Sequence, residues 1–408
     1  MRKIMMILLA VTLLLSVSGC GNTGKETAGF DEARANDDQY YLGTSMTRMI
    51  AEGPDAYYLF AGDYLYYMEK DTLEAYPLCG KPDCLHDRES DYEKQILCSA
   101  RIWAPNSITY CDGGLYITHK KASELGGFEL LLTKYDLSGN MEKELGVLPL
   151  ASGSIIHHRG KLYFSYIEIP PDAAEDDWGT DYYACLDLKT GEQQIIEEKP
   201  AGPVGGLCDT FAYGDYVYFR WGEYVGGDII VRASIGIYNT TDGTLTYMEP
   251  SKENASLAQP MIFQDKLIFS ETLILDRHVY DDEYGRDIYM AELDGTGIHK
   301  VSKAEYSGGV VCAYENMFLV SNRFYPVNGR FQEDFVAYKD FEYLGHFDLS
   351  GVDLTDGMAG NRYEIASYSD LGEYILFMTY LLDYIAVSKA DIEAGDVHPW
   401  IVAERSGL

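Results

Sequence analysis

Positive charge is scarce in this chain of 408 residues, which has 32 Lys and Arg against 65 Asp and Glu and a formal net charge of −33. Binding to nucleic-acid phosphates needs a basic face, so no nucleic-acid partner is expected. Long apolar runs are missing beyond the N-terminus, because the best one, residues 374–382, is bounded by Glu373 and Asp383 and is too short to span a bilayer.

Recognisable catalytic sequence motifs are missing as well. No motif typical of a serine hydrolase, a zinc protease or a nucleotide-binding loop occurs in a workable context, so we assign no catalytic residue. What the chain does have is 47% hydrophobic residues, close to the globular average, and 35 tyrosines. Aromatic side chains favour half-buried pleated surfaces, so the composition predicts an acidic, β-rich, folded protein.

The N-terminus has the order of a secretory signal. Arg2 and Lys3 precede a mostly apolar run of 14 residues, 4–17, which is shorter than a membrane span. Small residues then lead to Cys20, an arrangement that resembles the lipobox of bacterial lipoproteins. The resemblance implies that residues 1–19 are a lipoprotein signal peptide and that Cys20 carries the lipid as the mature N-terminus.

The residues after Cys20 predict how the folded part is attached. Residues 20–38 lack an apolar period and are rich in small and charged side chains, which is typical of a flexible tether. Removal of Arg2 and Lys3 leaves the mature chain at −33 − 2 = −35, so acyl chains, rather than anionic headgroups, must provide the membrane contact. We expect a protein that is lipid-anchored to the cell membrane and faces the extracellular side.

A short phrase recurs through the rest of the chain, residues 39–408. It is a polar turn followed by an apolar and aromatic doublet, and its copies are spaced by 47 to 57 residues. The copies are centred on Leu65, Leu115, Leu162, Val217, Leu267, Phe318 and Ile375. A near-constant period of this length is typical of a repeat architecture.

A second signature follows most copies of the phrase. Two β-like runs are joined by a Gly, Asp or Asn turn, as at residues 135–140 and 186–191. One unit therefore predicts four strands, as in a propeller blade, which buries both faces against its neighbours. We predict an all-β, seven-bladed β-propeller, with six or eight blades as alternatives. The first unit is compressed, and residues 46–52 either complete it or add a strand to the last unit.

The stretch AELDGTGIHKVS, residues 291–302, resembles the repeats of TolB-like propellers and of related extracellular propeller lipoproteins of Firmicutes. The resemblance covers residues 56–404. It implies the architecture and a surface lipoprotein, but little about chemistry, because propellers serve as enzymes, receptors and scaffolds.

Three cysteines and a histidine form the most chemically specific pattern. Cys79, Cys84, His86 and Cys98 supply three thiolates and an imidazole, a tetrahedral zinc set without an open position for water. The propeller lipoproteins that the chain resembles have a similar phrase after the first blade. The alternative is a disulfide of Cys79 or Cys84 with Cys98, as exported proteins favour.

Other cysteines and histidines do not extend this set. The remaining cysteines, apart from the one at the lipobox, lie in strand-like contexts, where they are expected to be buried free thiols: Cys111, Cys185, Cys208 and Cys312. His157 and His158 come at the end of a strand-like run beside Arg159, which favours a surface turn over a ligand pair.

Two acidic loops, residues 170–179 and 280–287, lie between the second and third predicted strands of their units. Their carboxylates, including Asp176 and Asp177, either bind a cation such as Ca²⁺ or remain solvated, and neither loop has EF-hand spacing. Trp178 beside them either offers an aromatic platform for a sugar or peptide, or packs between blades.

The sequence therefore supports two functions. The first is a surface module that binds or scaffolds an unidentified protein, peptide or glycan. The second is an extracellular hydrolase or lyase that acts on polysaccharide or peptide through carboxylates at the channel mouth.

Overall fold

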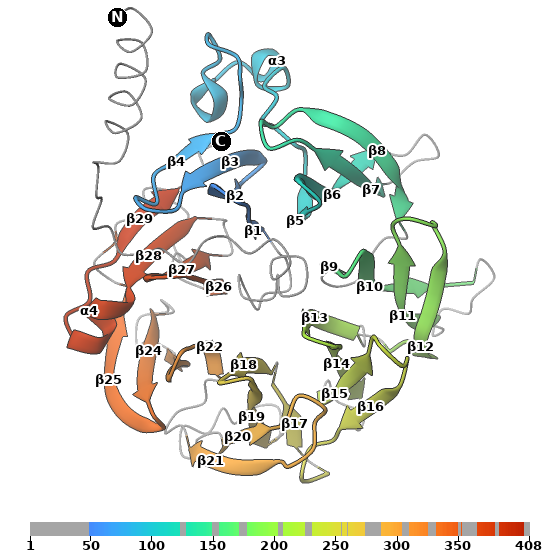
Figure 1. Ribbon diagram of the computed structural model, residues 1–408, viewed down its shortest axis with the longest axis vertical. Helices are drawn as coiled ribbons and strands as arrows, with labels where there is room; N and C mark the ends of the chain where they lie inside the picture. The colour runs from blue at the N-terminus through green and yellow to red at the C-terminus, as the bar shows by residue number, and fades with distance from the viewer. Residues whose placement is uncertain are drawn as a thin grey trace, which may run out of the picture. The chain divides into compact units, whose positions relative to one another are not determined.

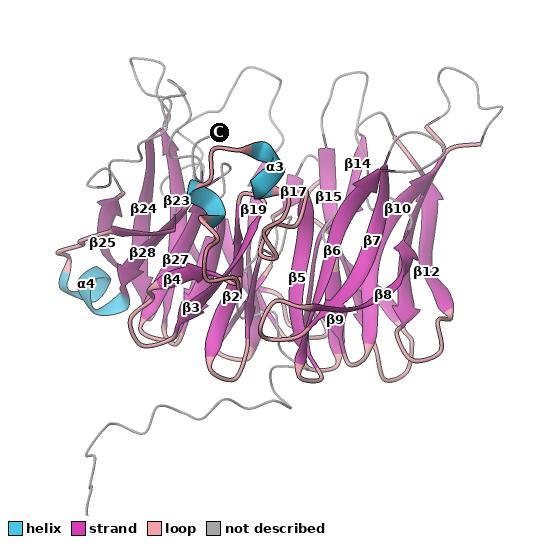
Figure 2. Cartoon of the chain, turned by 90° about the horizontal axis from the view of Figure 1, so that it is seen from above, coloured by secondary structure: helices cyan, strands magenta, loops and turns pink. Residues whose placement is uncertain are grey.

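The strands of the computed structural model form seven sheets around a ring (Figure 1). Seen edge-on, the sheets stand side by side and the few helices lie outside them (Figure 2). The structure describes residues 49–122, 128–148, 155–170, 178–202, 207–224, 231–253, 255–258, 260–273, 287–303, 310–324, 332–349, 352, 365–379 and 383–403. The predicted signal peptide, the lipidation site at Cys20 and the predicted domain boundary at residue 39 lie outside these ranges.

Each sheet is antiparallel and is built from strands that follow one another in the chain. The first four sheets are formed, in order, by β1 (Ile50–Glu52), β2 (Ala56–Ala61), β3 (Tyr64–Glu69) and β4 (Ala75–Pro77); β5 (Pro105–Cys111), β6 (Gly114–Ala122), β7 (Phe128–Tyr135) and β8 (Met141–Leu148); β9 (Ile156–His158), β10 (Lys161–Glu168), β11 (Thr180–Asp187) and β12 (Gln193–Pro200); and β13 (Leu207–Tyr213), β14 (Tyr216–Tyr224), β15 (Val231–Asn239) and β16 (Leu245–Met248).

The last three sheets complete the ring. They are formed by β17 (Ala255–Leu257), β18 (Met261–Phe263), β19 (Lys266–Leu273), β20 (Asp287–Ala291) and β21 (His299–Lys303); β22 (Val310–Tyr314), β23 (Met317–Phe324), β24 (Gln332–Lys339) and β25 (Glu342–Asp348); and β26 (Ile365–Leu371), β27 (Tyr374–Thr379), β28 (Tyr384–Ser388) and β29 (Trp400–Ala403). The described helices are η2 (His86–Arg88), α3 (Tyr92–Gln95) and α4 (Lys389–Ala394). None of these is long and apolar enough to cross a membrane.

The fold is a seven-bladed β-propeller, as the repeat predicts. In blade five, β17 and β18 both pair with β19 and together take the place of a single first strand. With these two counted as one, the recurring phrase in blades two to seven forms the turn from the first strand to the second, so Leu115 lies in β6 and Ile375 in β27. In blade one the phrase instead joins the second strand to the third, and Leu65 lies in β3. The first copy is thus one strand out of step with the others. This explains why the first unit is compressed in the sequence.

Aromatic and aliphatic side chains are buried between neighbouring blades. At the seam of blades three and four, the rings of Tyr183 and Phe219 stack with their centroids 4.1 Å apart, and Tyr163 and Tyr238 lie 6.4 Å apart. Similar apolar clusters lie between blades two and three, four and five, five and six, and six and seven. Each of these sheets therefore buries apolar side chains against its neighbours, which accounts for the abundance of tyrosine.

Within the described residues, the first and last blades of the ring exchange no strand. The described residues of the ambiguous N-terminal segment form β1, which pairs with β2, while blade seven supplies all four of its own strands. A buried tyrosine joins the two ends instead. The hydroxyl of Tyr384, in blade seven, lies 2.8 Å from the carbonyl oxygen of Phe60 and 3.4 Å from that of Met49, both in blade one.

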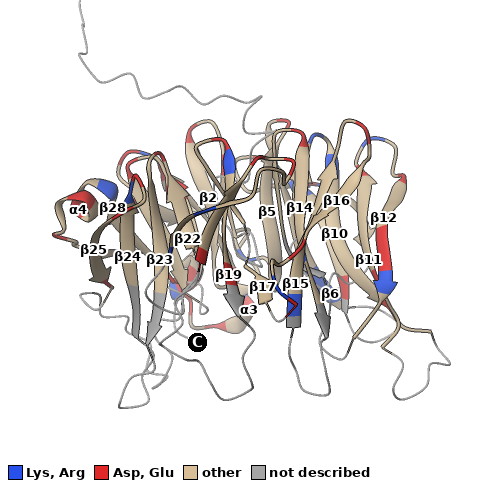
Figure 3. Cartoon of the chain, turned by 90° about the horizontal axis from the view of Figure 1, so that it is seen from below, with Lys and Arg blue, Asp and Glu red and all other residues tan. Residues whose placement is uncertain are grey.

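Acidic side chains recur at the turns between strands (Figure 3). In the last turn of blade three, the carboxylate of Asp187 accepts hydrogen bonds of 2.9 Å from the N–H groups of Lys189 and Thr190. Asp294 accepts similar bonds from the N–H and hydroxyl of Thr296. These hydrogen bonds lower the pKa of both carboxyls. Some of the acidic side chains therefore stabilise the hairpin turns by accepting hydrogen bonds within them.

The expected surface turn at His157 and His158 is wrong. Both histidines belong to β9, the first strand of blade three, and both are buried. The ring of His157 lies against that of Tyr116 in blade two, with centroids 6.0 Å apart, and the ring of His158 faces Tyr163. The error arose because two adjacent polar residues beside Arg159 resemble a turn, whereas an imidazole can pack between blades as an aromatic ring.

Burial of His157 predicts an acid-sensitive stability. Burial, followed by the charge of His158, lowers the pKa of His157 from 6.5 to about 4, so the unfolded chain binds a proton before the folded chain does. The free energy of unfolding should therefore fall by about 3 kcal/mol between pH 6.5 and pH 4 through this group alone. Urea unfolding of His157→Phe should show a correspondingly weaker pH dependence over that range.

The variant His398→Asn provides the control, because it removes an exposed imidazole and so separates the effect of burial from the loss of a histidine. Equal pH dependence in wild type and His157→Phe would contradict the assignment.

Candidate metal centre

The predicted ligands belong to a segment that interrupts the outer strand of blade one. This insert, residues 79–99, follows β4 and ends where residues 100–102 return to the edge of β3. The return is a short antiparallel bridge between Arg101 and Tyr64, supported by a 2.8 Å hydrogen bond from the N–H of Ile102 to the carbonyl oxygen of Asp63. The outer strand is thus made of two pieces with the insert between them.

The two pieces meet at one residue, Leu65. Its N–H donates to the carbonyl oxygen of Ala100 and its carbonyl oxygen accepts from the N–H of Leu78, each at 2.8 Å. Cys79 directly follows one piece, and Cys98 comes two residues before the other. The sheet itself therefore brings these two cysteines together.

The other two predicted ligands, Cys84 and His86, lie farther from the ends of the insert. Cys84 and His86 lie at the start of η2, where the hydroxyl of Tyr66 in β3 donates a 2.7 Å hydrogen bond to the carboxylate of Asp87. His86 has a φ of 54°, the left-handed region that costs an L-residue about 1 kcal/mol. Such strain persists where the surroundings require it and often marks a functional position.

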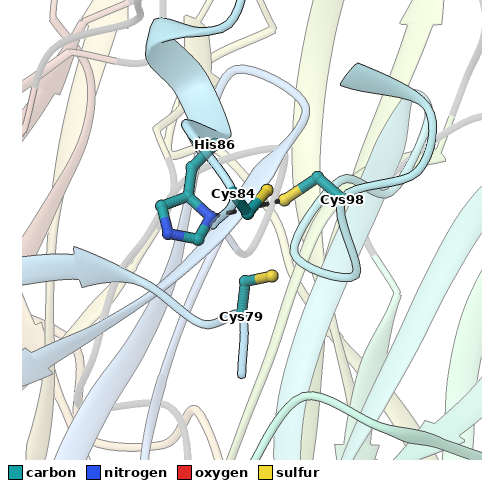
Figure 4. Close-up of side chains that lie close together, drawn as sticks. All are labelled: Cys79, Cys84, His86 and Cys98. Atoms are coloured by element: carbon teal, nitrogen blue, oxygen red, sulfur yellow. Dashed lines mark hydrogen bonds between the residues drawn. The ribbon is translucent and has the colours of Figure 1, made fainter. Parts of the chain in front are cut away.

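The four side chains converge (Figure 4). All four ligand atoms lie within 4.8 Å of one another, and Cys98 Sγ is 3.7 Å from His86 Nδ1. In a tetrahedral zinc site with bonds of about 2.3 Å to sulfur, two sulfur ligands are about 3.8 Å apart. A contraction of about 1 Å at most would therefore give zinc geometry, and the cluster could hold a metal ion.

The electrostatics of the thiols also suit a cation. Burial alone raises the pKa of Cys79, but hydrogen bonds from Ser99 and from the N–H of Lys81 outweigh it and lower that pKa to about 6. Burial raises the pKa of Cys98 to about 12, and the neighbouring Cys84 and Cys79 add to the rise. The negative charge of one thiolate thus disfavours ionisation of the neighbouring thiol. A bound cation would offset this repulsion.

The insert has almost no core of its own. Cys98 is its only buried residue, and neither η2 nor α3 contains a buried side chain. Polar contacts are present: Lys81 donates to the carbonyl oxygen of Leu97, and the guanidinium of Arg101 lies 5.1 Å from the centre of the Tyr92 ring. Hydrophobic burial therefore cannot supply the folding energy of this segment.

The large apolar side chains of the insert are instead exposed. Tyr92 is 61% and Leu97 66% accessible, and Leu85 and Ile96 are also exposed. These four belong to fifteen exposed large apolar side chains in the described part of the chain, and Tyr76 and Trp103 flank them in sequence. The sequence analysis missed this feature, because an apolar run in a loop gives no sign of which side chains will be buried.

The second predicted site is not assembled within the described residues. Asp176 and Asp177 lie outside them, while Trp178 is exposed in the connection from β10 to β11. Of residues 280–287, only Asp287 is described, and its carboxylate pairs with Lys300 at 2.6 Å. Both connections do join second to third strands, as predicted.

The remaining cysteines behave as expected where the structure describes them. Cys111, Cys185 and Cys312 are all buried, and burial raises the pKa of Cys185 and Cys312. Cys208 belongs to β13, but its side chain lies outside the described part.

The chain is similar in fold to the tricorn protease and also matches other solved structures at lower TM-scores. The tricorn protease matches 90% of this chain with a TM-score of 0.51 and 10% identity, and the chain spans 36% of that protein. A prolyl endopeptidase structure is another match, with a TM-score of 0.46 and 14% identity; the match covers 90% of this chain and 50% of the prolyl endopeptidase chain. The β-propeller domain of the Trilobed protease from Pyrococcus furiosus has a TM-score of 0.41 and 12% identity over 74% of this chain and 96% of that domain.

At these identities the similarity concerns the fold, and this chain spans about a third to a half of the full peptidases. No family model and no curated protein matches the sequence.

Proposed function

We propose that the protein is a lipid-anchored propeller on the outer side of the cell membrane that acts as a binding or scaffold module. The proposed anchor is Cys20, supported by the basic residues, the apolar run and the small residues that precede it. The resemblance of residues 291–302 to TolB-like and Firmicutes propeller lipoproteins supports the same assignment.

Cys79, Cys84, His86 and Cys98 are proposed to hold a structural zinc ion. The observation that carries this proposal is the insert of 21 residues, 79–99, with one buried residue and four converging ligands. A segment without a core gains its folding energy from elsewhere, and a bound metal can supply it. A complete set of four protein ligands leaves no position for a reacting water, so the role of the ion is structural.

The exposed apolar side chains of the insert are proposed to form the binding surface. Apolar and aromatic groups displayed on a rigid support are typical of contact sites, because little conformational entropy is lost when they are covered. Tyr92 and Leu97 are the most accessible of them. The partner is a protein, a peptide or a glycan.

The alternative, a hydrolase or lyase, has less support. Several carboxylates of the described residues have structural partners: Asp370 pairs with Lys389 at 2.7 Å, and the buried Glu271 accepts hydrogen bonds from the N–H and hydroxyl of Ser251. Asp383 likewise interacts with Thr379. A catalytic acid or base would instead face substrate.

Zinc analysis tests the metal assignment. Protein purified with its thiols reduced should contain about one zinc ion per chain, and Cys84→Ala should lose most of it, because removal of one ligand from a closed site weakens binding sharply. Elemental analysis measures the zinc content.

Cys312→Ala removes a buried thiol outside the cluster and should retain the metal, so it serves as the control. Wild-type protein that contains no zinc and has an intact disulfide between two of these cysteines would rule the site out.

Metabolic labelling tests the anchor. Full-length protein produced in a bacterium with lipoprotein processing should incorporate labelled fatty acid and fractionate with the membrane. Cys20→Ser should abolish the incorporation of label and the cleavage before residue 20, because the thiol of Cys20 is the proposed acylation site. A mature protein that begins at a residue other than Cys20 would refute the assignment.

Affinity capture tests the binding surface. The wild-type protein should retain specific envelope proteins, or specific glycans or peptides on an array, and the double variant Tyr92→Ser, Leu97→Ser should retain at least about tenfold less, as expected when two central contacts are lost. The matched control Tyr343→Ser, Leu344→Ser alters exposed apolar residues of β25, far from the insert in sequence. Equal retention by both double variants would exclude the insert as the binding surface.

A further inference from the structure

The four ligands of the metal centre differ in what holds them in place. Cys79 and Cys98 flank the two pieces of strand that pair with β3, and Leu65 bonds to both pieces through its own N–H and carbonyl oxygen. The positions of these two cysteines therefore depend on the sheet. Cys84 and His86 depend on the insert, which has no core.

This division has a chemical consequence. Two thiols held close by a sheet remain neighbours when the metal leaves, and a disulfide forms where two such sulfurs can approach to about 2.05 Å. The sulfurs of Cys79 and Cys98 lie within 4.8 Å, and rotation of the side chains shortens such a distance without moving the strands. Cys84 has no comparable support.

We propose that the centre exists in two states, a reduced state that holds zinc with four ligands and an oxidised state that holds a Cys79–Cys98 disulfide without zinc. This inference rests on the proposed zinc site. The oxidant is a peroxide, which an extracellular site can meet.

The reaction balances as a two-electron oxidation. The thiolate of one cysteine attacks a peroxide oxygen, the O–O bond breaks, and a sulfenic acid and water form after uptake of one proton. The second thiolate attacks that sulfenic sulfur, the S–S bond forms as the S–O bond breaks, and the departing hydroxide takes up a second proton to give a second water. In total, two thiolates, one hydrogen peroxide and two protons give one disulfide and two waters.

Zinc leaves because only Cys84 and His86 remain as ligands, and two ligands do not make a structural site. The disulfide still joins the two ends of the insert, while residues 84–86 lose their attachment to the metal ion. The positions of the exposed side chains of Leu85 and Tyr92 then change, because they depend on the conformation of the insert. Oxidation would thus alter the proposed binding surface while the propeller stays folded.

The experiment uses the full chain, extracted from membranes in detergent, reduced and loaded with zinc. Hydrogen peroxide is titrated in while a chromogenic chelator reports free zinc, and peptide mapping under non-reducing conditions locates disulfides. We expect loss of all bound zinc in step with a Cys79–Cys98 disulfide, with Cys84 still open to alkylation. A dithiol reductant followed by zinc should restore the starting state.

Two variants keep the test decisive. Cys84→Ala should still form the Cys79–Cys98 disulfide, because the sheet positions both sulfurs, whereas Cys98→Ala should form none at residue 79. Cys312→Ala should behave as wild type.

The outcomes separate the two proposals. Failure of the reduced protein to bind zinc defeats the zinc assignment. A protein that binds zinc but retains it under peroxide, or that forms Cys84–Cys98 or Cys79–Cys84 instead, overturns the switch and leaves the zinc site intact.

Discussion

Burial of sheet faces between neighbours is the constraint on which this structure depends. A four-stranded sheet with apolar side chains on both faces is stable only when another sheet covers each face, and a ring provides such neighbours for every blade. The seams described above, such as that of Tyr183 and Phe219, show this arrangement. The closing seam adds the hydroxyl of Tyr384, which bonds to carbonyl oxygens of blade one.

The insert of blade one stands outside this source of stability. It leaves the sheet after Leu78 and returns at Ala100, and in between it exposes the apolar side chains that a folded segment would normally bury. Local hydrogen bonds, such as that of Tyr66 with Asp87, fix single points of the segment. A metal ion bound by the three converging thiols and the imidazole would fix the whole segment, and the proposed binding surface depends on that.

Much of the architecture could be predicted from the sequence, because a repeated turn and doublet reflects a repeated packing environment. The seven copies give the correct blade number, although the copy at Leu65 is displaced by one strand. The convergence of Cys79, Cys84, His86 and Cys98 also agrees with the expectation from their spacing. What could not be predicted is long-range pairing: the role of Leu65 in uniting Cys79 with Cys98, and the burial of His157 between blades, depend on contacts that no local pattern encodes.

Diffraction from crystals of the reduced protein, measured on both sides of the zinc absorption edge, shows whether these four side chains hold zinc. We predict a single strong anomalous peak at about 2.3 Å from the sulfurs of Cys79, Cys84 and Cys98 and at about 2.0 Å from a ring nitrogen of His86. Crystals of reduced protein with a well-ordered insert but no anomalous peak at these four side chains would contradict the account.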